Sequence, residues 1–439
     1  MCGKGKEKWL GGLMKATSLT ELLNKEKEEI IEGCDLCGLC VDACPAIPLT
    51  PLASMSSFEV QEKVIDVLKN GVMSEEAGIR VASCTYCAMC VDTCPQGLDP
   101  LHLLEILQIE MVKLGQKRYP RMEIKLGDRI CLISDVLASL QMKPEERRWL
   151  TGVPDNPPPK DFVVFTGCGP VMMADKMFLI ADIFDRLGLD FVMVAGGELC
   201  CGGRYLSVNL ERAEACNREF VHALNAFKPG TVIYVCPECY YQMTQYYAKI
   251  NPPPFENEEL LHFLSQNIDK LELTHPVNKI VTFHDPCSLA RRIGDTESVR
   301  RLLSAVPGLK LVEMKHNRQQ TMCCGAETNR TFPKVSQEMT RLCLEEVAGT
   351  GAQVLVDFCQ GCLAQFYLEE PKYPFEVQNI LTILGEAMGI SYEDKLKKFY
   401  RSSDLDNDIA EARENIEANS YNFDHVARLA KRFFVGPSS

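Results

Sequence analysis

The clearest regularity along the chain is a set of short apolar runs, each followed by a segment with helical periodicity. The runs are rich in β-branched and aromatic residues and too short for helices; they are residues 161–167, 190–197, 231–235, 278–285 and 352–358. Runs of this kind, apolar at successive positions, are typical of buried parallel strands. Apolar residues recur every three or four positions in segments 171–188, 209–227, 296–306 and 336–349. The alternation predicts a doubly wound α/β fold with parallel sheets.

Cysteines follow these predicted strands in two copies of one arrangement. The first copy consists of Cys168, Cys200, Cys201, Cys236 and Cys239, and the second of Cys287, Cys323, Cys324, Cys359 and Cys362. The Cys-Cys pairs lie 123 residues apart (201 to 324), as do the Cys-x-x-Cys pairs (236 to 359), which indicates a duplicated unit. Because ligands of such folds gather at the carboxyl ends of the strands, we expect five thiols of each copy to meet at one sheet edge.

Two further cysteine runs precede this region, 50 residues apart, and both read Cys-x-x-Cys-x-x-Cys-x-x-x-Cys-Pro. This spacing is typical of bacterial ferredoxins, in which the fourth cysteine of each run binds the cluster of the other run. The expected ligands of two cubane 4Fe-4S clusters are therefore Cys34, Cys37, Cys40 with Cys94, and Cys84, Cys87, Cys90 with Cys44. Zinc is the alternative, although a zinc site does not require this particular spacing of cysteines.

Composition narrows the classes of function. The 22 cysteines in 439 residues do not resemble a small disulfide-rich scaffold, so we expect metal or redox work in a reducing compartment. The net charge of −13 argues against nucleic-acid binding. We see no secretory signal and no apolar stretch long enough to span a membrane, and therefore expect a soluble, cytoplasmic chain. Any exchange of electrons with a membrane quinone or cytochrome would then need a partner subunit at the cytoplasmic membrane face.

The motifs around the later cysteines resemble a known family. TGCGP, ELCCGG and VCPEC in the first copy, with HDPCS, MCCGAE and FCQGC in the second, are similar to the CCG domains of heterodisulfide reductases. A ferredoxin module fused to two CCG domains resembles the catalytic subunit of the membrane-linked type, and the resemblance covers residues 30–390. The same architecture recurs in iron-sulfur subunits of glycolate oxidase, anaerobic glycerol-3-phosphate dehydrogenase and lactate oxidation. The implied fold is α/β, with a mainly helical ferredoxin-like domain followed by two tandem Rossmann-like CCG units with parallel sheets.

Proline-rich segments and the family resemblance together suggest the domain boundaries. We expect an N-terminal helical extension (1–30), the two-cluster domain (31–115), a helical connection with a proline-rich linker (116–160), two CCG domains (161–270 and 271–390) and a charged helical tail (391–439). For the tail we expect solvated helices, or a docking arm for a partner subunit.

The resemblance also implies cofactors. A noncubane 4Fe-4S cluster would be held by the five cysteines of each copy, and the two clusters would face one another across the substrate pocket. An ordinary cubane takes four thiolates, so a fifth indicates either a bridging ligand or a structural cysteine. The alternatives are a vicinal disulfide, or zinc held by four of the five thiolates in each copy, or zinc in one copy and iron in the other.

Two hypotheses of function follow. In the first, the chain is a disulfide reductase-type enzyme subunit that passes electrons through the cubanes to the paired clusters. A disulfide needs two electrons and yields two thiolates, so two one-electron clusters can cleave it, or oxidise thiols in reverse, without a free thiyl radical. In the second, it relays electrons between a flavoprotein dehydrogenase and a quinone-facing or electron-bifurcating partner. No flavin-binding fingerprint is visible in the sequence.

A few other residues are candidates for secondary roles. His284, beside Cys287, can donate a hydrogen bond or proton to a product thiolate, or merely orient its loop. Arg204, Arg291 and Arg292 can meet an anionic substrate, or form ordinary ion pairs. Four cysteines fit no ligand spacing, and a buried apolar setting is the default for the two in helical patterns. They are Cys2, Cys131, Cys216 and Cys343.

Overall fold

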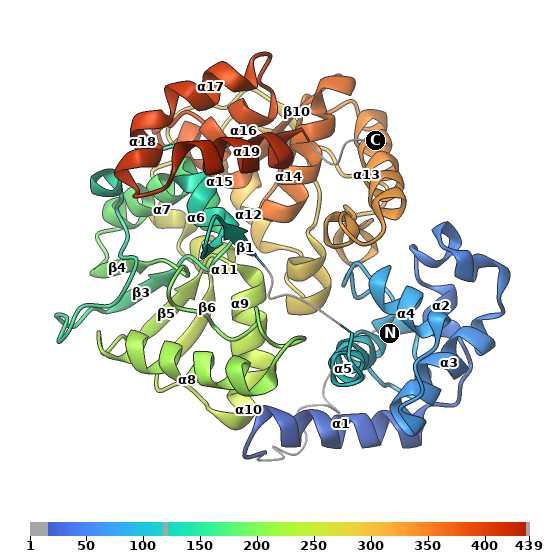
Figure 1. Ribbon diagram of the computed structural model, residues 1–439. Coiled ribbons are helices and arrows are strands. Elements are labelled where there is room, and N and C mark those ends of the chain that lie inside the picture. Colours follow the sequence, from blue (N-terminus) through green and yellow to red (C-terminus); the bar gives the residue numbers. More distant parts are fainter. Residues whose placement is uncertain (1–15, 117–121, 436–439) are drawn as a thin grey trace.

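The computed structural model describes residues 16–116 and 122–435, which form a helical region and two α/β units. Figure 1 shows the helical N-terminal region (blue) beside the two units, and the C-terminal helices (red) lying across both. Cys2 and part of the predicted N-terminal extension lie outside the described residues.

The N-terminal region is helical because capping residues and apolar spacing both favour helices. Ser18 caps the first helix, Ser56 and Glu59 form a capping box, and Asp99 caps the helix that ends the region. The helices are α1 (Leu19–Gly33), α2 (Leu39–Asp42), α3 (Ser57–Asn70), α4 (Glu75–Ala82) and α5 (Pro100–Lys113), with 3-10 turns η2 (Ile47–Leu49), η3 (Pro51–Ser54) and η4 (Val91–Thr93). The apolar faces of α1, α3, α4 and α5 share one core, and the two cysteine runs lie in and around the short elements α2 and η4.

Each α/β unit contains a four-stranded parallel sheet, which confirms the predicted fold class. The first sheet has the order β4-β3-β5-β6 and the second β8-β7-β9-β10, so the two units share one topology. The strands are β3 (Phe162–Phe165), β4 (Phe191–Val194), β5 (Thr231–Tyr234), β6 (Glu256–Glu259), β7 (Ile280–Phe283), β8 (Lys310–Leu311), β9 (Val354–Asp357) and β10 (Glu376–Asn379). The covering helices are α7 (Ala174–Arg186), α8 (Leu210–Asn225), α9 (Pro237–Gln242), α11 (Leu260–Gln266), α12 (Ser298–Ala305), α13 (Pro333–Gly349), α14 (Gln360–Glu369) and α15 (Ile380–Ala387).

Three strands of the two parallel sheets were not predicted from the sequence. The strands β6 and β10 lie at sheet edges and read ENEE and EVQN, while β8 has only two residues. Edge strands are often short and polar because these features discourage pairing with other chains. An apolar pattern therefore cannot reveal them.

The connection between the helical region and the first unit is partly different from the helical connection expected. It contains an antiparallel hairpin of β1 (Glu123–Leu126) and β2 (Arg129–Leu132), followed by α6 (Ile133–Ala138) and the 3-10 turn η5 (Pro144–Glu146). Both strands have only four residues and alternate little between apolar and polar side chains, so their sequence carries a weak strand signal.

The C-terminal segment is helical as expected, but its helices pack on the rest of the chain and are not a fully solvated tail. Its helices are α16 (Lys395–Tyr400), α17 (Leu405–Glu411), α18 (Arg413–Ala418) and α19 (Phe423–Phe434). Phe399, Ile416, Val426 and Phe434 are buried in one core with the second unit and the hairpin. Because the segment is highly charged overall, its sequence did not reveal this apolar face, although the apolar residues recur with the period of an amphipathic helix.

Candidate metal centres

The first predicted ligand set is gathered in one pocket. Cys34, Cys37, Cys40 and Cys94 all line it, together with Gln61 from α3. The amide of Gln61 lies 3.5 Å from the Cys34 sulfur and 3.4 Å from the Cys40 sulfur. Burial raises the pKa of Cys40, and the neighbouring thiols of the set add to that shift. Four convergent thiols in one pocket suit a 4Fe-4S cubane, and such a cluster would also supply the positive charge that these thiolates need.

The second predicted set surrounds a buried arginine. Arg80 on α4 is 2% exposed, and its Nη1 donates to the Cys44 sulfur at 3.3 Å. Burial lowers the pKa of Arg80, but the thiolates of Cys44, Cys84 and Cys90 outweigh that effect and raise it. Sequence reasoning missed Arg80, since an arginine at the end of a helix carries no distinguishing signal.

The second set adjoins the second α/β unit. The Cys87 and Cys323 side chains hydrogen-bond each other, and this bond is the largest cause of the lowered pKa of Cys87. Both cysteines belong to one apolar cluster with Val41, Val335 and Met339. Nearby, the Thr331 hydroxyl donates to the Ala82 carbonyl at 2.7 Å. The second predicted ligand set of the helical region is therefore in direct contact with a cysteine of the second copy.

The five cysteines of the first copy form what we call the first nest (Cys168, Cys200, Cys201, Cys236, Cys239). Cys201 hydrogen-bonds both Cys200 and Cys239, and Cys239 also hydrogen-bonds Cys236. Cys168 interacts electrostatically with Cys236 and Cys201. Gly167, with φ +76°, permits this approach, because a Cβ there would lie 2.6 Å from the Cβ of Cys236.

The second nest (Cys287, Cys323, Cys324, Cys359, Cys362) repeats this arrangement. The Cys362 and Cys324 sulfurs lie 3.0 Å apart, Cys323 hydrogen-bonds Cys287 and Cys324, and Cys362 hydrogen-bonds Cys359. All cysteines among the described residues are free thiols, so neither vicinal pair is a disulfide. Cys168, Cys236, Cys287 and Cys359 follow the carboxyl ends of β3, β5, β7 and β9, and the two Cys-Cys pairs lie in the segments after β4 and β8.

The two nests approach each other across the boundary between the units. A Cβ on Gly169, next to Cys168, would lie 2.6 Å from the side-chain amide of Gln360, next to Cys359. Arg292 lies in the π-helical turn η9 (Ser288–Ile293), which follows Cys287, and its Nη1 lies 2.7 Å from the carboxylate of Glu238, between Cys236 and Cys239. Residues that flank one nest therefore contact residues that flank the other.

The candidate residues around the nests have distinct surroundings. His284 is 1% exposed; its Nδ1 lies 2.6 Å from Asp357, and its Nε2 lies 2.9 Å from the Met322 carbonyl. Arg291 donates to the carbonyls of Cys87, Gln319 and Thr321, so it holds the backbone of these two segments together. The polar groups of His284 and Arg291 that these bonds engage are thus occupied by partners within the chain.

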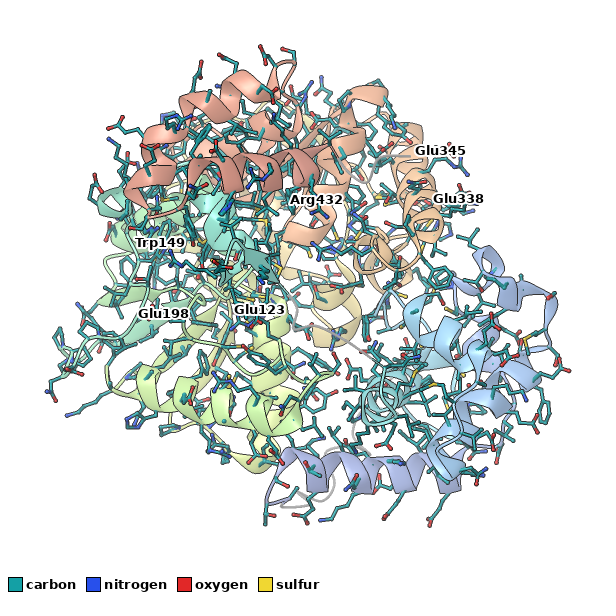
Figure 2. All side chains as sticks on the ribbon, viewed as in Figure 1. Glu123, Trp149, Glu198, Glu338, Glu345 and Arg432 are labelled. Carbon is teal, nitrogen blue, oxygen red and sulfur yellow. The ribbon has the colours of Figure 1, made fainter. Side chains whose placement is uncertain are left out.

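Arg204 has the freest position of these candidates. It is partly exposed, interacts with Cys168 and Cys200, and stacks over Tyr205 with its Cζ 5.3 Å from the ring centroid. The Tyr205 hydroxyl donates to Glu123 on the hairpin at 2.6 Å. Figure 2 shows the position of Glu123. The buried Nε of Arg204 has no hydrogen-bond partner. An anionic group beside the first nest would meet this guanidinium.

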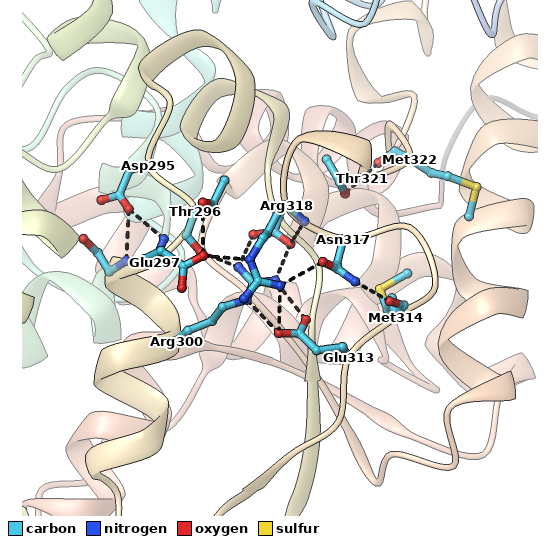
Figure 3. A network of polar contacts seen from close by, with 12 residues as sticks. Asp295, Thr296, Glu297, Arg300, Glu313, Met314, Asn317, Arg318, Thr321 and Met322 are labelled. Carbon is cyan, nitrogen blue, oxygen red and sulfur yellow. Dashed lines mark hydrogen bonds and ion pairs between the residues drawn. The ribbon is translucent and has the colours of Figure 1, made fainter. Parts of the chain in front are cut away.

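A polar network that the sequence did not reveal holds the loops of the second nest. Arg300 forms two hydrogen bonds with Asp285, at 2.7 and 2.9 Å, two residues before Cys287. The backbone N–H of Arg318 also donates to Asp285. Figure 3 shows Arg300 and Arg318 gathered on Glu313, in the segment that leads to Cys323. Only the fold brings these charges together.

The spare cysteines have no shared role. Cys216 on α8 and Cys343 on α13 are buried, as expected for cysteines in helices. They differ by one helical turn between the units, because Phe220 and not Cys216 occupies the position of Cys343 relative to the Cys-Cys pair. Cys343 hydrogen-bonds His284, whereas Cys131 lies half-buried on β2.

Comparison with known proteins supports iron-sulfur chemistry. The family model of the 4Fe-4S dicluster domain matches residues 33–98, and that of the CCG cysteine-rich domain matches residues 162–244 and 281–367. Among the described residues, none of the helices has the length and apolar character needed to cross a membrane.

Curated relatives come from several redox complexes. One of the subunits of the dihydromethanophenazine:CoB–CoM heterodisulfide reductase of Methanosarcina barkeri is 30% identical over 250 residues, 53% of this chain and 60% of the relative. One of the subunits of the fumarate reductase (CoM/CoB) of Methanothermobacter marburgensis is 27% identical, over 51% of this chain and 45% of the relative. The EtfAB:quinone oxidoreductase of Syntrophomonas wolfei is 24% identical, over 42% and 27%. The matches thus span about 60% or less of these relatives' own length.

Proposed function

The chain belongs to the proteins that join a 4Fe-4S dicluster domain to two CCG domains, and from this premise we propose that it is a heterodisulfide reductase-like oxidoreductase subunit. It would pass electrons through two cubane 4Fe-4S clusters to two noncubane 4Fe-4S clusters, one in each nest. These would reduce a disulfide, or oxidise two thiols in reverse, by two one-electron steps. The observation that carries the proposal is the pair of complete five-thiol nests, whose flanking residues contact each other across the boundary between the units.

The pairing of the nests matches the electron count of the reaction. Cleavage of one disulfide consumes two electrons and leaves two thiolates. Iron-sulfur clusters, when bound, supply electrons singly and offer iron sites for sulfur. Gly169 and Gln360 bring the two cysteine loops close together, and we propose that one small disulfide binds where both nests can be reached. Arg204 is placed to meet an anionic part of that substrate beside the first nest.

The chain's own residues would also supply the electron path. Cys87 belongs to the second cubane set and hydrogen-bonds Cys323 of the second nest. Arg291 fixes this junction, since it binds the carbonyl of Cys87 and the carbonyl of Thr321 two residues before Cys323. Electrons would come from other redox subunits, for which we propose a flavoprotein or a membrane cytochrome or quinone module. We place the chain in the cytoplasm, attached to a membrane only through such a partner.

A relay without a substrate of its own is the second candidate. It is favoured by the similarity to an EtfAB:quinone oxidoreductase, whose name couples EtfAB to a quinone. Such a relay would need the contact between Cys87 and Cys323 but would not need an open site between the nests.

The test is turnover by anaerobically purified protein that carries its full iron and sulfide. Reduced viologen is mixed with a series of mixed disulfides, and its oxidation is followed optically. We expect turnover with one thiol pair, and an EPR signal of the oxidised protein that appears only with that thiol. Intact clusters without disulfide consumption would favour the relay instead.

Two variants locate the chemistry. Cys201→Ser and Cys324→Ser each remove one thiol from a nest and should abolish disulfide consumption while the cubane EPR signals remain. Cys216→Ser, in α8 outside the nests, serves as the matched control and should keep turnover. Equal loss in all three variants would contradict a specific role of the nests.

A further inference from the structure

The two cubane ligand sets differ in exposure. All four cysteines of the second set are buried, and one of them contacts the second nest. In the first set Cys37 is exposed, and Cys34, Cys40 and Cys94 are half-buried. Because electron transfer slows steeply with distance, the surface around Cys37 is, among the described residues of the two cubane sets, the most accessible point for an external electron-transfer protein.

Two exposed apolar side chains lie close to Cys37. Leu39 on α2 is 45% exposed and Phe58 on α3 is 50% exposed. Their helices are in contact, since a Cβ on Gly38 would lie 2.9 Å from the backbone nitrogen of Phe58. Figure 1 shows α2 and α3 at the outer edge of the helical region, away from both sheets. Exposed apolar groups beside a cofactor site are typical of interaction surfaces.

Acidic side chains surround these two residues. Asp42 accepts a hydrogen bond from Ser57, and Asp35 accepts one from Gln96, which follows the Cys94–Pro95 pair. Glu59 follows Phe58 and is exposed. The sequence contains no lysine or arginine from residue 28 to residue 62. We call Asp35, Cys37, Leu39, Asp42, Phe58 and Glu59 the Cys37 surface.

We propose that the Cys37 surface docks an electron-transfer protein whose own cofactor edge is surrounded by lysine and arginine. The inference rests on the proposed electron path and names the chemistry of the partner at its outer end. Opposite charges would steer the encounter, and the apolar centre formed by Leu39 and Phe58 would be covered in the complex. A second copy of this chain would present like charge, and anionic lipids would be repelled, so neither fits this surface.

The test uses a lysine-rich c-type cytochrome as the probe, beside the same cytochrome with succinylated lysines. The reduced, iron-loaded protein is mixed with ferric cytochrome in a stopped-flow instrument. Each transfer oxidises the chain by one electron and reduces one haem iron from ferric to ferrous. We expect the native cytochrome to react at least about tenfold faster at low salt, and this advantage to shrink on the order of tenfold at ~0.3 M salt.

Matched variants identify the surface. Asp42→Asn keeps the acceptor for Ser57, and Glu59→Gln keeps the capping box, so the double variant removes two charges with little strain. We expect it to lower the rate with native cytochrome roughly threefold to tenfold at low salt. Glu211→Gln with Glu219→Gln, exposed on the distant helix α8, should leave the rate unchanged. Phe58→Ser should lower the rate at high salt as well, because its contribution is apolar.

The outcomes separate the two levels of inference. Equal rates for the native and succinylated cytochromes, or equal slowing by the α8 control, would overturn the docking surface while leaving the proposed function intact. Loaded clusters that reduce neither cytochrome nor the small oxidant ferricyanide would instead contradict the proposed electron path.

Discussion

His284 and Asp357 form a buried pair beneath the second nest, with His284 Nδ1 2.6 Å from Asp357 Oδ2. In the first unit Phe165 and Tyr234 occupy the same places, three residues before the first cysteine and two before the Cys-x-x-Cys pair. Their rings are 6.2 Å apart and pack edge to face. The two nests therefore rest on different chemistry, polar beneath the second and aromatic beneath the first.

The polar pair joins two cysteine loops of the second nest. A carbonyl can only accept, so Nε2 of His284 donates to Met322, which precedes Cys323. Asp357 accepts from the backbone N–H groups of Phe358 and Cys359 at 2.6 and 2.7 Å. Of the two roles that the sequence allowed for His284, this geometry favours orientation of the loop.

We expect His284→Phe to empty the second nest selectively. The variant loses the bond to Met322 and leaves a buried carboxylate without its partner, so the two loops separate. The purified protein should contain about four iron atoms fewer per chain. Thiol alkylation with mass spectrometry should then label Cys324 and Cys362 while Cys201 and Cys239 stay protected.

Two further variants control this result. Asp357→Asn keeps the acceptor for the backbone and offers an amide N–H to a neutral His284, so it should retain most of the iron. Tyr234→Phe loses only the 2.8 Å bond to Asn257 and should retain all of it. Normal iron content in His284→Phe, with both nests protected, would show that the pair does not support the nest.

Arg80 should raise the reduction potential of the second cubane. Its guanidinium is buried beside Cys44, so its positive charge would favour the more negative, reduced form of a cluster held by this set. At an effective dielectric constant of about 20, Arg80→Gln should lower that potential by on the order of 100 mV. Potentiometric EPR titration measures the change, and Arg80→Lys should restore much of the potential. An unchanged midpoint in Arg80→Gln would mean that other groups compensate the charge.

Much of this site could be predicted because its signal is local. Cys34, Cys37 and Cys40 follow a fixed spacing, and the strands before Cys168 and Cys287 are apolar runs. The parallel topology then brings the strand ends to one edge, which places the cysteines of each copy together. The fold class and the clustering of these cysteines thus follow from periodicity and spacing, whereas their assignment as cluster ligands stays a prediction.

The remainder depends on contacts between segments far apart in the sequence. Arg80 and Cys44 are 36 residues apart, and Arg292 and Glu105 are 187 apart. No periodic pattern links such pairs, because each is made by the packing of separate elements. The hydrophobic pattern also fails to predict the polar edge strands and the burial of the charged C-terminal helices, because the apolar contacts of these elements lie on only one face.

Arg292 should hold the three parts of the chain together. It is 4% exposed, pairs with Glu105 of α5 at 3.2 Å and with Glu238 at 2.7 Å, and lies 4.0 Å from the Tyr241 ring centroid. Arg292→Ala leaves Glu105 buried without a counter-charge and should cost about 3–5 kcal/mol of unfolding free energy. Anaerobic urea unfolding measures this. Arg301 is exposed on α12, and Arg301→Ala should change the free energy of unfolding by less than about 0.5 kcal/mol. An equally small effect of Arg292→Ala would show that Arg292 does not hold the three parts together.

Glu259 should make the first unit less stable as the pH rises. It ends β6 and caps α11, and burial raises its pKa to about 8, well above the value of about 4.3 in an unfolded chain. Its stabilising contribution is therefore complete below about pH 4 and declines until the pH passes about 8. Glu259→Gln keeps the acceptor for the His262 N–H and cannot ionise. We expect its stability advantage over the natural protein to grow by about 2 kcal/mol from pH 6 to pH 8 in urea unfolding. Glu256→Gln, exposed on the same strand, should show no such pH dependence, and a parallel response of both variants would exclude burial of Glu259 as the cause.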